Sequence, residues 1–128
     1  MSKLKRIINN CILNVKKSNV NSIPSIFATY YYGNFKVNTG SLVIVYIFET
    51  DSNLKMAHNN GLTKKIEKET KENLINNGYP IDAFTQERSN LSEQTFLDRL
   101  NNPKVSILFI SNQRVQEEAN GILFEYLK

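Results

Sequence analysis

The sequence has little of the residues from which catalytic and metal sites are usually built. It contains one cysteine, Cys11, and one histidine, His58. A single cysteine excludes an internal disulfide, and one histidine without further ligands cannot form a zinc site. A nucleophilic pair of Cys11 and His58 would need an exposed thiol of low pKa. We therefore expect no metal, no cofactor and no catalytic role for these two residues, with His58 on the surface.

Glycine and long apolar runs are also scarce. The five glycines fit turns or helix ends, and none belongs to a glycine-rich phosphate loop. The longest apolar run, Leu42 to Phe48, has seven residues, which suits a buried strand and falls far short of a membrane-spanning helix. The basic N-terminal segment lacks the continuous apolar region of a signal peptide. These absences together predict a cytoplasmic protein.

Acidic residues are missing from the first 48 positions, which carry a formal charge of +6, whereas the remainder carries −2. The basic residues of this first part are Lys3, Lys5, Arg6, Lys16, Lys17 and Lys36. Such a surface could attract nucleic acid, lipid headgroups or an acidic protein. The same residues could equally be solvated lysines without a partner, and the sequence leaves both interpretations open.

The first segment has apolar residues at helical spacing. They are Leu4, Ile7, Ile8, Cys11, Ile12 and Val15. Ser2 is placed to cap this helix, and the apolar stripe could cover a sheet or lie on a membrane surface. We expect it to pack in the core, with Cys11 as a small buried side chain.

A β-rich region follows Pro24. The run from Ile26 to Tyr32 predicts a strand, Gly33-Asn34 a two-residue turn, and Phe35 to Val37 a returning strand. After a second turn, Leu42 to Phe48 predicts a central strand. The expected arrangement is a three-stranded meander.

The remainder alternates helices and strands less regularly. We expect a helix capped by Thr50 or Asp51, a second helix capped by Thr63, and a short helix or loop at 81–84. A helix from Ser92 to Pro103 and a strand over Val105–Ile110 should follow. The last two elements should be a helix that Ser111 caps and that runs through Ala119, and a strand over Ile122–Leu127. The order is α-βββ-αα-(α)-β-α-β. We predict a single α+β domain over residues 1–128, with about five strands in a mixed or mostly antiparallel sheet and helices on one face.

The tyrosines next to the first turn are the clearest candidate for a binding surface. Alternation along a strand puts Tyr30 and Tyr32 on one sheet face and Tyr31 on the other. If the face of Tyr30 and Tyr32 is open, these rings and nearby Lys36 could contact a protein or stack on bases. If the face is covered, they are core aromatics with hydroxyls at the rim.

Carboxylates offer the only route to catalysis. Glu49 and Asp51 follow the central strand, and Glu117 and Glu118 lie on the late helix. Paired carboxylates could hold Mg²⁺ or act as acid and base. Helix capping explains Asp51 without chemistry, and a solvated helix face explains the two late glutamates.

Several short segments resemble small single-domain bacterial proteins, some of them immunity proteins encoded beside polymorphic toxins. The resemblance lies in Phe48-Glu49-Thr50-Asp51, Leu54, Ala57, Asn60-Gly61-Leu62, Gly78-Tyr79-Pro80, Phe109-Ile110-Ser111, Val115, Gly121, Phe124 and Tyr126-Leu127-Lys128. It implies a fold and a toxin-binding role, and it carries over no functional residue.

The leading hypothesis is therefore a non-enzymatic protein-binding module, specifically an immunity protein that neutralises a cognate toxin, with Tyr30, Tyr32 and Lys36 at the contact. One alternative is nucleic-acid binding through the basic N-terminal helix and the tyrosine strand. The other is a small hydrolase or metal-dependent enzyme with carboxylates near Glu49 and Asp51.

Overall fold

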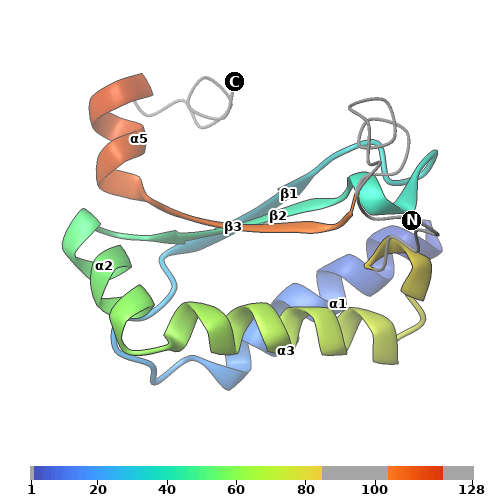
Figure 1. Ribbon diagram of the computed structural model, residues 1–128, viewed down its shortest axis with the longest axis horizontal. Helices are drawn as coiled ribbons and strands as arrows, with labels where there is room; N and C mark the ends of the chain where they lie inside the picture. Colours follow the sequence, from blue (N-terminus) through green and yellow to red (C-terminus); the bar gives the residue numbers. More distant parts are fainter. Residues whose placement is uncertain (1, 85–103, 120–128) are drawn as a thin grey trace, which may run out of the picture.

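The computed structural model describes residues 2–84 and 104–119, which form a three-stranded sheet with helices (Figure 1). The elements are α1 (Lys3–Ser18), β1 (Ala28–Tyr32), η1 (Thr39–Ser41), β2 (Val43–Phe48), α2 (Asp51–Asn59), α3 (Leu62–Asn76), η2 (Ile81–Ala83), β3 (Ser106–Ser111) and α5 (Asn112–Ala119). The predicted α+β class is confirmed. The predicted helix from Ser92 and the predicted strand over 122–127 lie outside the described residues, so five strands are not confirmed.

The sheet has the strand order β1-β2-β3 and is mixed. Strand β1 runs antiparallel to β2, with Tyr30 opposite Val45, and β3 runs parallel to β2, with Leu108 opposite the same valine. All six residues of β2 are apolar or aromatic, and five of them are buried. A strand that is apolar on both faces is typical of a central position, which is where the sequence placed it.

The predicted meander is wrong, because residues 35–37 form no strand. Strand β1 pairs directly with β2, and Phe35 turns into the core, where its ring lies 6.1 Å from that of Tyr31. Gly33 has φ +118°, and a Cβ there would lie 2.1 Å from the carbonyl oxygen of Ser41. The glycine thus permits a close approach of two backbone segments; it does not make a two-residue hairpin.

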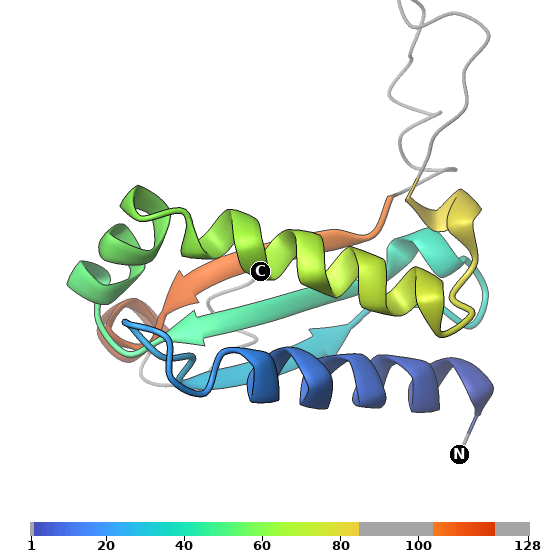
Figure 2. The same ribbon diagram turned by 90° about the horizontal axis from the view of Figure 1, so that it is seen from below.

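Helices α1 and α3 lie side by side across one face of the sheet (Figure 2). Their buried side chains meet Ile44, Tyr46 and Phe48 of β2 in the larger core cluster. The predicted helix α1 is confirmed with its cap, since Ser2 Oγ accepts a hydrogen bond from the Lys5 N–H at 3.2 Å. Cys11 is fully buried in this core, as expected.

A short chain of polar groups crosses that core. The hydroxyls of Tyr46 and Thr70 lie 2.7 Å apart, and Thr70 donates its proton to the Ile66 carbonyl, also at 2.7 Å. Because Thr70 has only one hydroxyl proton, Tyr46 must be the donor to Thr70. Burial raises the pKa of the Tyr46 phenol well above its ordinary value, and the hydrogen bond to Thr70 opposes this shift only partly. Tyr46 therefore remains a neutral donor.

The opposite face of the sheet has its own small cluster. Val45, Ile47 and Ile110 pack there against Val115 of α5. Helix α5 rises from this side of the sheet, whereas α1 and α3 lie on the other (Figure 1). The expectation that all helices share one face is therefore wrong for α5, where the buried residue Val115 alone gave little indication of the side on which the helix packs.

The chain between β2 and β3 passes through α2 and α3. Thr50 caps α2 by accepting a hydrogen bond from the Asn53 N–H at 3.0 Å, which decides between the two predicted caps. Helix α3 begins at Leu62 rather than after Thr63, because Gly61 adopts a left-handed conformation that turns the chain between the helices. In the described ranges 2–84 and 104–119, no helix is long and apolar enough to span a membrane.

Candidate functional site

The face of the sheet opposite α1 and α3 carries the two predicted tyrosines. Strand pairing places Tyr30 beside Val45, with Leu108 on the other side of that valine, and Tyr32 beside Val43. Tyr30 is 49% exposed and Leu108 37% exposed, whereas Tyr32 is half-buried against the Val45 cluster. The structure thus brings Tyr30 and Tyr32 to one face, with Tyr30 the more accessible of the two.

This face, which we name the tyrosine face, contains no charged residue at its nine strand positions. They are Ala28, Tyr30, Tyr32, Val43, Val45, Ile47, Ser106, Leu108 and Ile110. A sheet face in permanent contact with water normally carries polar side chains at alternate positions. On the tyrosine face, Val45, Ile47 and Ile110 are buried in the cluster with Val115 of α5, whereas Tyr30 and Leu108 stay exposed.

Lys36 is less closely tied to this face than the sequence suggested. It lies exposed in the turn after β1, beyond Gly33. In the part of the chain that the structure describes, no hydrogen bond or cation–π contact joins Lys36 to Tyr30 or Tyr32. Its place beside the two tyrosines remains a prediction from the sequence.

The basic helix and the tyrosines lie on opposite faces of the sheet. Helix α1 carries five of the six basic residues of the first 48 positions and packs on Tyr46 and Phe48, whereas Tyr30 belongs to the other face. They do not form one surface. The alternative hypothesis, in which the helix and the tyrosine strand bind nucleic acid together, stays a prediction that would need a ligand to reach both faces.

A second candidate site lies where β2 and β3 end and α2 and α5 begin. A cavity of about 340 Å³ opens there. It is lined by Asp51, Leu54, Lys55, His58, Phe109, Ile110, Ser111 and Arg114. We call it the α2–α5 pocket. The parallel pairing of β2 with β3 creates this pocket. Phe48 and Ser111 are opposite each other, so the two strands finish at the same end of the sheet.

Asp51 is held from two sides within this pocket. The Ser111 hydroxyl donates to one carboxylate oxygen, and the Arg114 Nε donates to the other at 3.3 Å. The hydrogen bond from Ser111, and then Arg114, keeps the pKa of the Asp51 carboxyl below its ordinary value. Ser111 also accepts a hydrogen bond from the Arg114 N–H at 3.1 Å, as the predicted cap of α5. Asp51 is therefore a fixed anion that ties α2 to α5, and a poor proton donor.

The other predicted carboxylates do not join Asp51 in the pocket. Glu49 is exposed and does not belong to the lining; its backbone carbonyl accepts a hydrogen bond from Gln113 N–H at 3.1 Å. Glu118 pairs with Arg114 at 3.0 Å, and Glu117 accepts a hydrogen bond from Gln113. Over residues 2–84 and 104–119, no group of three or more His, Cys, Asp or Glu side chains could hold a metal ion.

His58 lies at the edge of the α2–α5 pocket. Its Nδ1 is 3.1 Å from the hydroxyl of buried Thr63, and its ring meets Phe109 edge-on at a centroid distance of 6.2 Å. The sequence predicted a surface histidine without a functional role. The ring is exposed, but it is oriented by two neighbours and faces a cavity that also holds Asp51 and Lys55.

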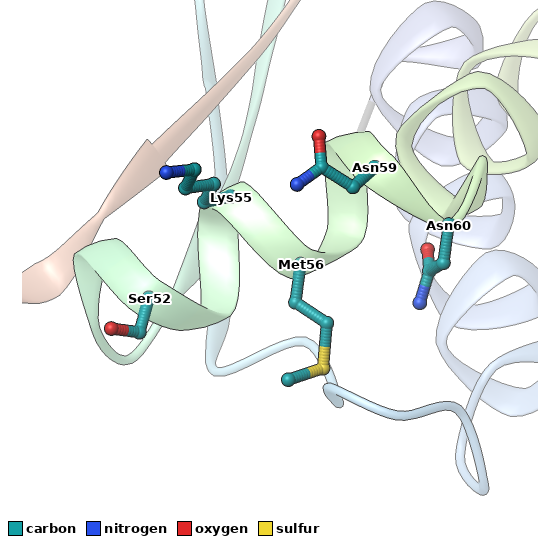
Figure 3. A pocket seen from close by; sticks show the side chains of 5 residues that line it. All are labelled: Ser52, Lys55, Met56, Asn59 and Asn60. Atoms are coloured by element: carbon teal, nitrogen blue, oxygen red, sulfur yellow. The ribbon is translucent and has the colours of Figure 1, made fainter.

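A hollow of about 420 Å³ lies on the outer side of α2 (Figure 3). Its lining is Ser52, Lys55, Met56, Asn59 and Asn60. Met56 and Lys55 leave the helix in different directions, and Asn60 donates a hydrogen bond to the Ile23 carbonyl at 3.0 Å. Among the described residues, Lys55 borders both this hollow and the α2–α5 pocket.

Arg114 and Lys55 are the site residues that the sequence did not indicate. Each is an ordinary basic residue on a short helix. The available signal was positional, because Asp51 lies just after one strand and Ser111 at the end of another, and the two would meet if those strands were parallel neighbours. Comparisons with protein-family models, with curated proteins and with solved structures found no match to this chain.

Proposed function

We propose that the chain is a protein-binding module that docks a partner protein on the tyrosine face. The observation that carries the proposal is the absence of charge from a sheet face that is apolar, aromatic and partly exposed. The cores of protein–protein interfaces are depleted in charged residues and enriched in tyrosine. Tyr30 and Leu108 would form the centre of such a contact.

A protein fits this face better than a nucleic acid does. Nucleic-acid affinity depends on lysine and arginine at the phosphates, and the nine strand positions contain neither. The resemblance of several segments to immunity proteins supports the further proposal that the partner is a toxin encoded by a neighbouring gene. Neutralisation by surface contact would need no catalytic residue.

The test begins with the product of the adjacent gene, purified with this chain and titrated by calorimetry. Tyr30→Ala should weaken the complex by about 2 kcal/mol or more, as expected for a tyrosine at the centre of an interface. Because the Tyr30 side chain is about half exposed, the Tyr30→Ala variant should have a thermal stability close to that of the wild type. Tyr32→Ala should also weaken binding, with some loss of stability because Tyr32 packs against the cluster that contains Val45 and Val115.

Leu13→Ala is the matched control, since Leu13 is 55% exposed on α1, on the far side of the sheet. It should change neither binding nor stability. The proposal fails if Tyr30→Ala binds like the Leu13 variant. It fails equally if Tyr30→Ala costs the 3–5 kcal/mol of a buried aromatic, because the face would then be covered by the chain itself.

A further inference from the structure

We propose that the α2–α5 pocket binds a small organic anion, with a phosphate or carboxylate group at Lys55 and an apolar body against Phe109. This site is distinct from the tyrosine face and does not depend on the proposed protein partner. The cavity of about 340 Å³ is within the size range of small-molecule sites. Five polar and three apolar residues make up its described lining, so it can contact both the charged group and the apolar body of such a ligand.

The position of the pocket in the fold favours ligand binding. In sheets with parallel strands, ligands bind outside the carboxyl ends of those strands, where the connecting chains separate. Strands β2 and β3 are the parallel pair here, and α2 and α5 leave their ends on different sides of the sheet (Figure 1). The α2–α5 pocket lies in that separation.

The charges in the pocket select an anion. Arg114 is already satisfied, because Asp51 and Glu118 both pair with it. Lys55 has no ion-pair partner among the residues that the structure describes, and the described lining residues carry one more positive than negative charge when His58 is counted as neutral. An incoming anion would therefore pair with Lys55 without breaking an existing contact.

The wall next to Lys55 suits an apolar or aromatic body. Phe109, Leu54 and Ile110 line it, and Phe109 stacks on Tyr46 behind it at a centroid distance of 5.8 Å. That stack, together with the edge contact from His58, holds the Phe109 ring in place. The Asp51 carboxylate already accepts hydrogen bonds from Ser111 and Arg114, so it would contribute little binding energy to a cation.

The experiment uses the whole chain labelled with ¹⁵N and three probes of similar shape: phenyl phosphate, benzoate and neutral benzyl alcohol. We expect phenyl phosphate or benzoate at millimolar concentration to shift the amide signals of Lys55, His58, Phe109 and Ser111, and benzyl alcohol to shift them far less. The stronger of the two anions identifies the phosphate or the carboxylate class.

Lys55→Gln should weaken binding of that anion by roughly threefold or more, the range for a solvent-exposed charge contact. Lys64→Gln, which removes the same charge from an exposed position on α3, should leave it unchanged. Equal shifts with benzyl alcohol, equal affinities of the two lysine variants, or no shift with either anion would overturn the proposal. None of these outcomes bears on the tyrosine face, whose residues lie outside this lining apart from Ile110.

Discussion

At the scale of single residues, a few polar groups buried in the core remain uncharged and hydrogen-bonded. Cys11 is fully buried, and burial raises the pKa of its thiol to about 12. Its Sγ donates weakly to the Thr70 carbonyl at 3.5 Å. The sequence predicted the burial of Cys11 from its position in the apolar stripe of the helix. The spacing that reveals such a stripe is a local property of the sequence.

Cys11 should therefore be almost unreactive in the folded protein. Nucleophilic attack requires the thiolate, and both the raised pKa and the burial suppress it. Iodoacetamide at neutral pH should alkylate the native protein at least about a hundredfold more slowly than the unfolded protein. Mass spectrometry after timed exposure, with and without denaturant, measures this ratio. Rapid alkylation of the native protein would show that the thiol is accessible and would reopen a catalytic role.

The Tyr46–Thr70 pair should respond asymmetrically to mutation. Tyr46→Phe leaves Thr70 bonded to Ile66 and should lower the free energy of unfolding by about 1 kcal/mol. Thr70→Val leaves the buried Tyr46 hydroxyl without a partner and should cost more, about 1–3 kcal/mol. The double variant should cost less than the sum, because the second change removes the unsatisfied group. Urea denaturation of all three variants measures the cycle, and strict additivity would contradict the pairing.

At the scale of elements, the sequence predicted well whatever depends on short-range pattern. The helices α1 and α2, the central strand β2 and the cap of α5 follow from periodicity and capping residues. The prediction of a hairpin at Gly33 was wrong, because the local preference for a turn competed with more favourable contacts to distant residues. Phe35 enters the core, and β1 pairs with the most apolar strand available, Val43–Phe48.

The two glycines Gly33 and Gly61 should differ in their tolerance of alanine. Both have positive φ, but a Cβ at Gly61 meets nothing within 4 Å, whereas one at Gly33 would lie 2.1 Å from Ser41 O. Gly61→Ala should therefore cost only the backbone strain, about 1–2 kcal/mol. Gly33→Ala should cost clearly more, because the backbone of residue 41 must move. Thermal and urea denaturation rank the two, and a Gly61 variant that is the less stable would contradict this account.

The α2–α5 pocket shows why site residues were harder to predict than elements. Asp51 and Ser111 are some 60 residues apart in sequence, and each had a sufficient local explanation as a capping residue. Their meeting depends on the register of β2 with β3, in which Phe48 is opposite Ser111. Register between distant parallel strands has no short-range signal, so the Asp51–Ser111–Arg114 contact could not be derived beforehand.

At the scale of the whole molecule, the sheet separates the basic helix from the tyrosine face. The basic helix α1 covers one side of the sheet, and the uncharged tyrosine face lies on the other. The charge asymmetry was evident in the sequence. Its separation from the tyrosines was not, since it depends on which face of β1 packs against α1.

This separation predicts that a complex formed through the tyrosine face is insensitive to salt. Screening weakens contacts between charged groups, and the nine strand positions of this face carry none. The dissociation constant should change by less than about threefold between low and high salt, whereas phosphate contacts would weaken binding by orders of magnitude. Calorimetry at several salt concentrations measures the slope. A steep slope would shift the contact to the basic helix.

The parallel pairing of β2 with β3 also has a consequence for the order in which the protein is made. When β2 leaves the ribosome, β1 is already available to pair with one of its edges, but residues 49–105 must be translated before β3 appears. At roughly 5–20 residues per second, that interval lasts several seconds. Throughout it, the most apolar strand of the nascent chain has an open edge, which is a template for unwanted pairing. Chaperone protection during translation should matter most in this interval.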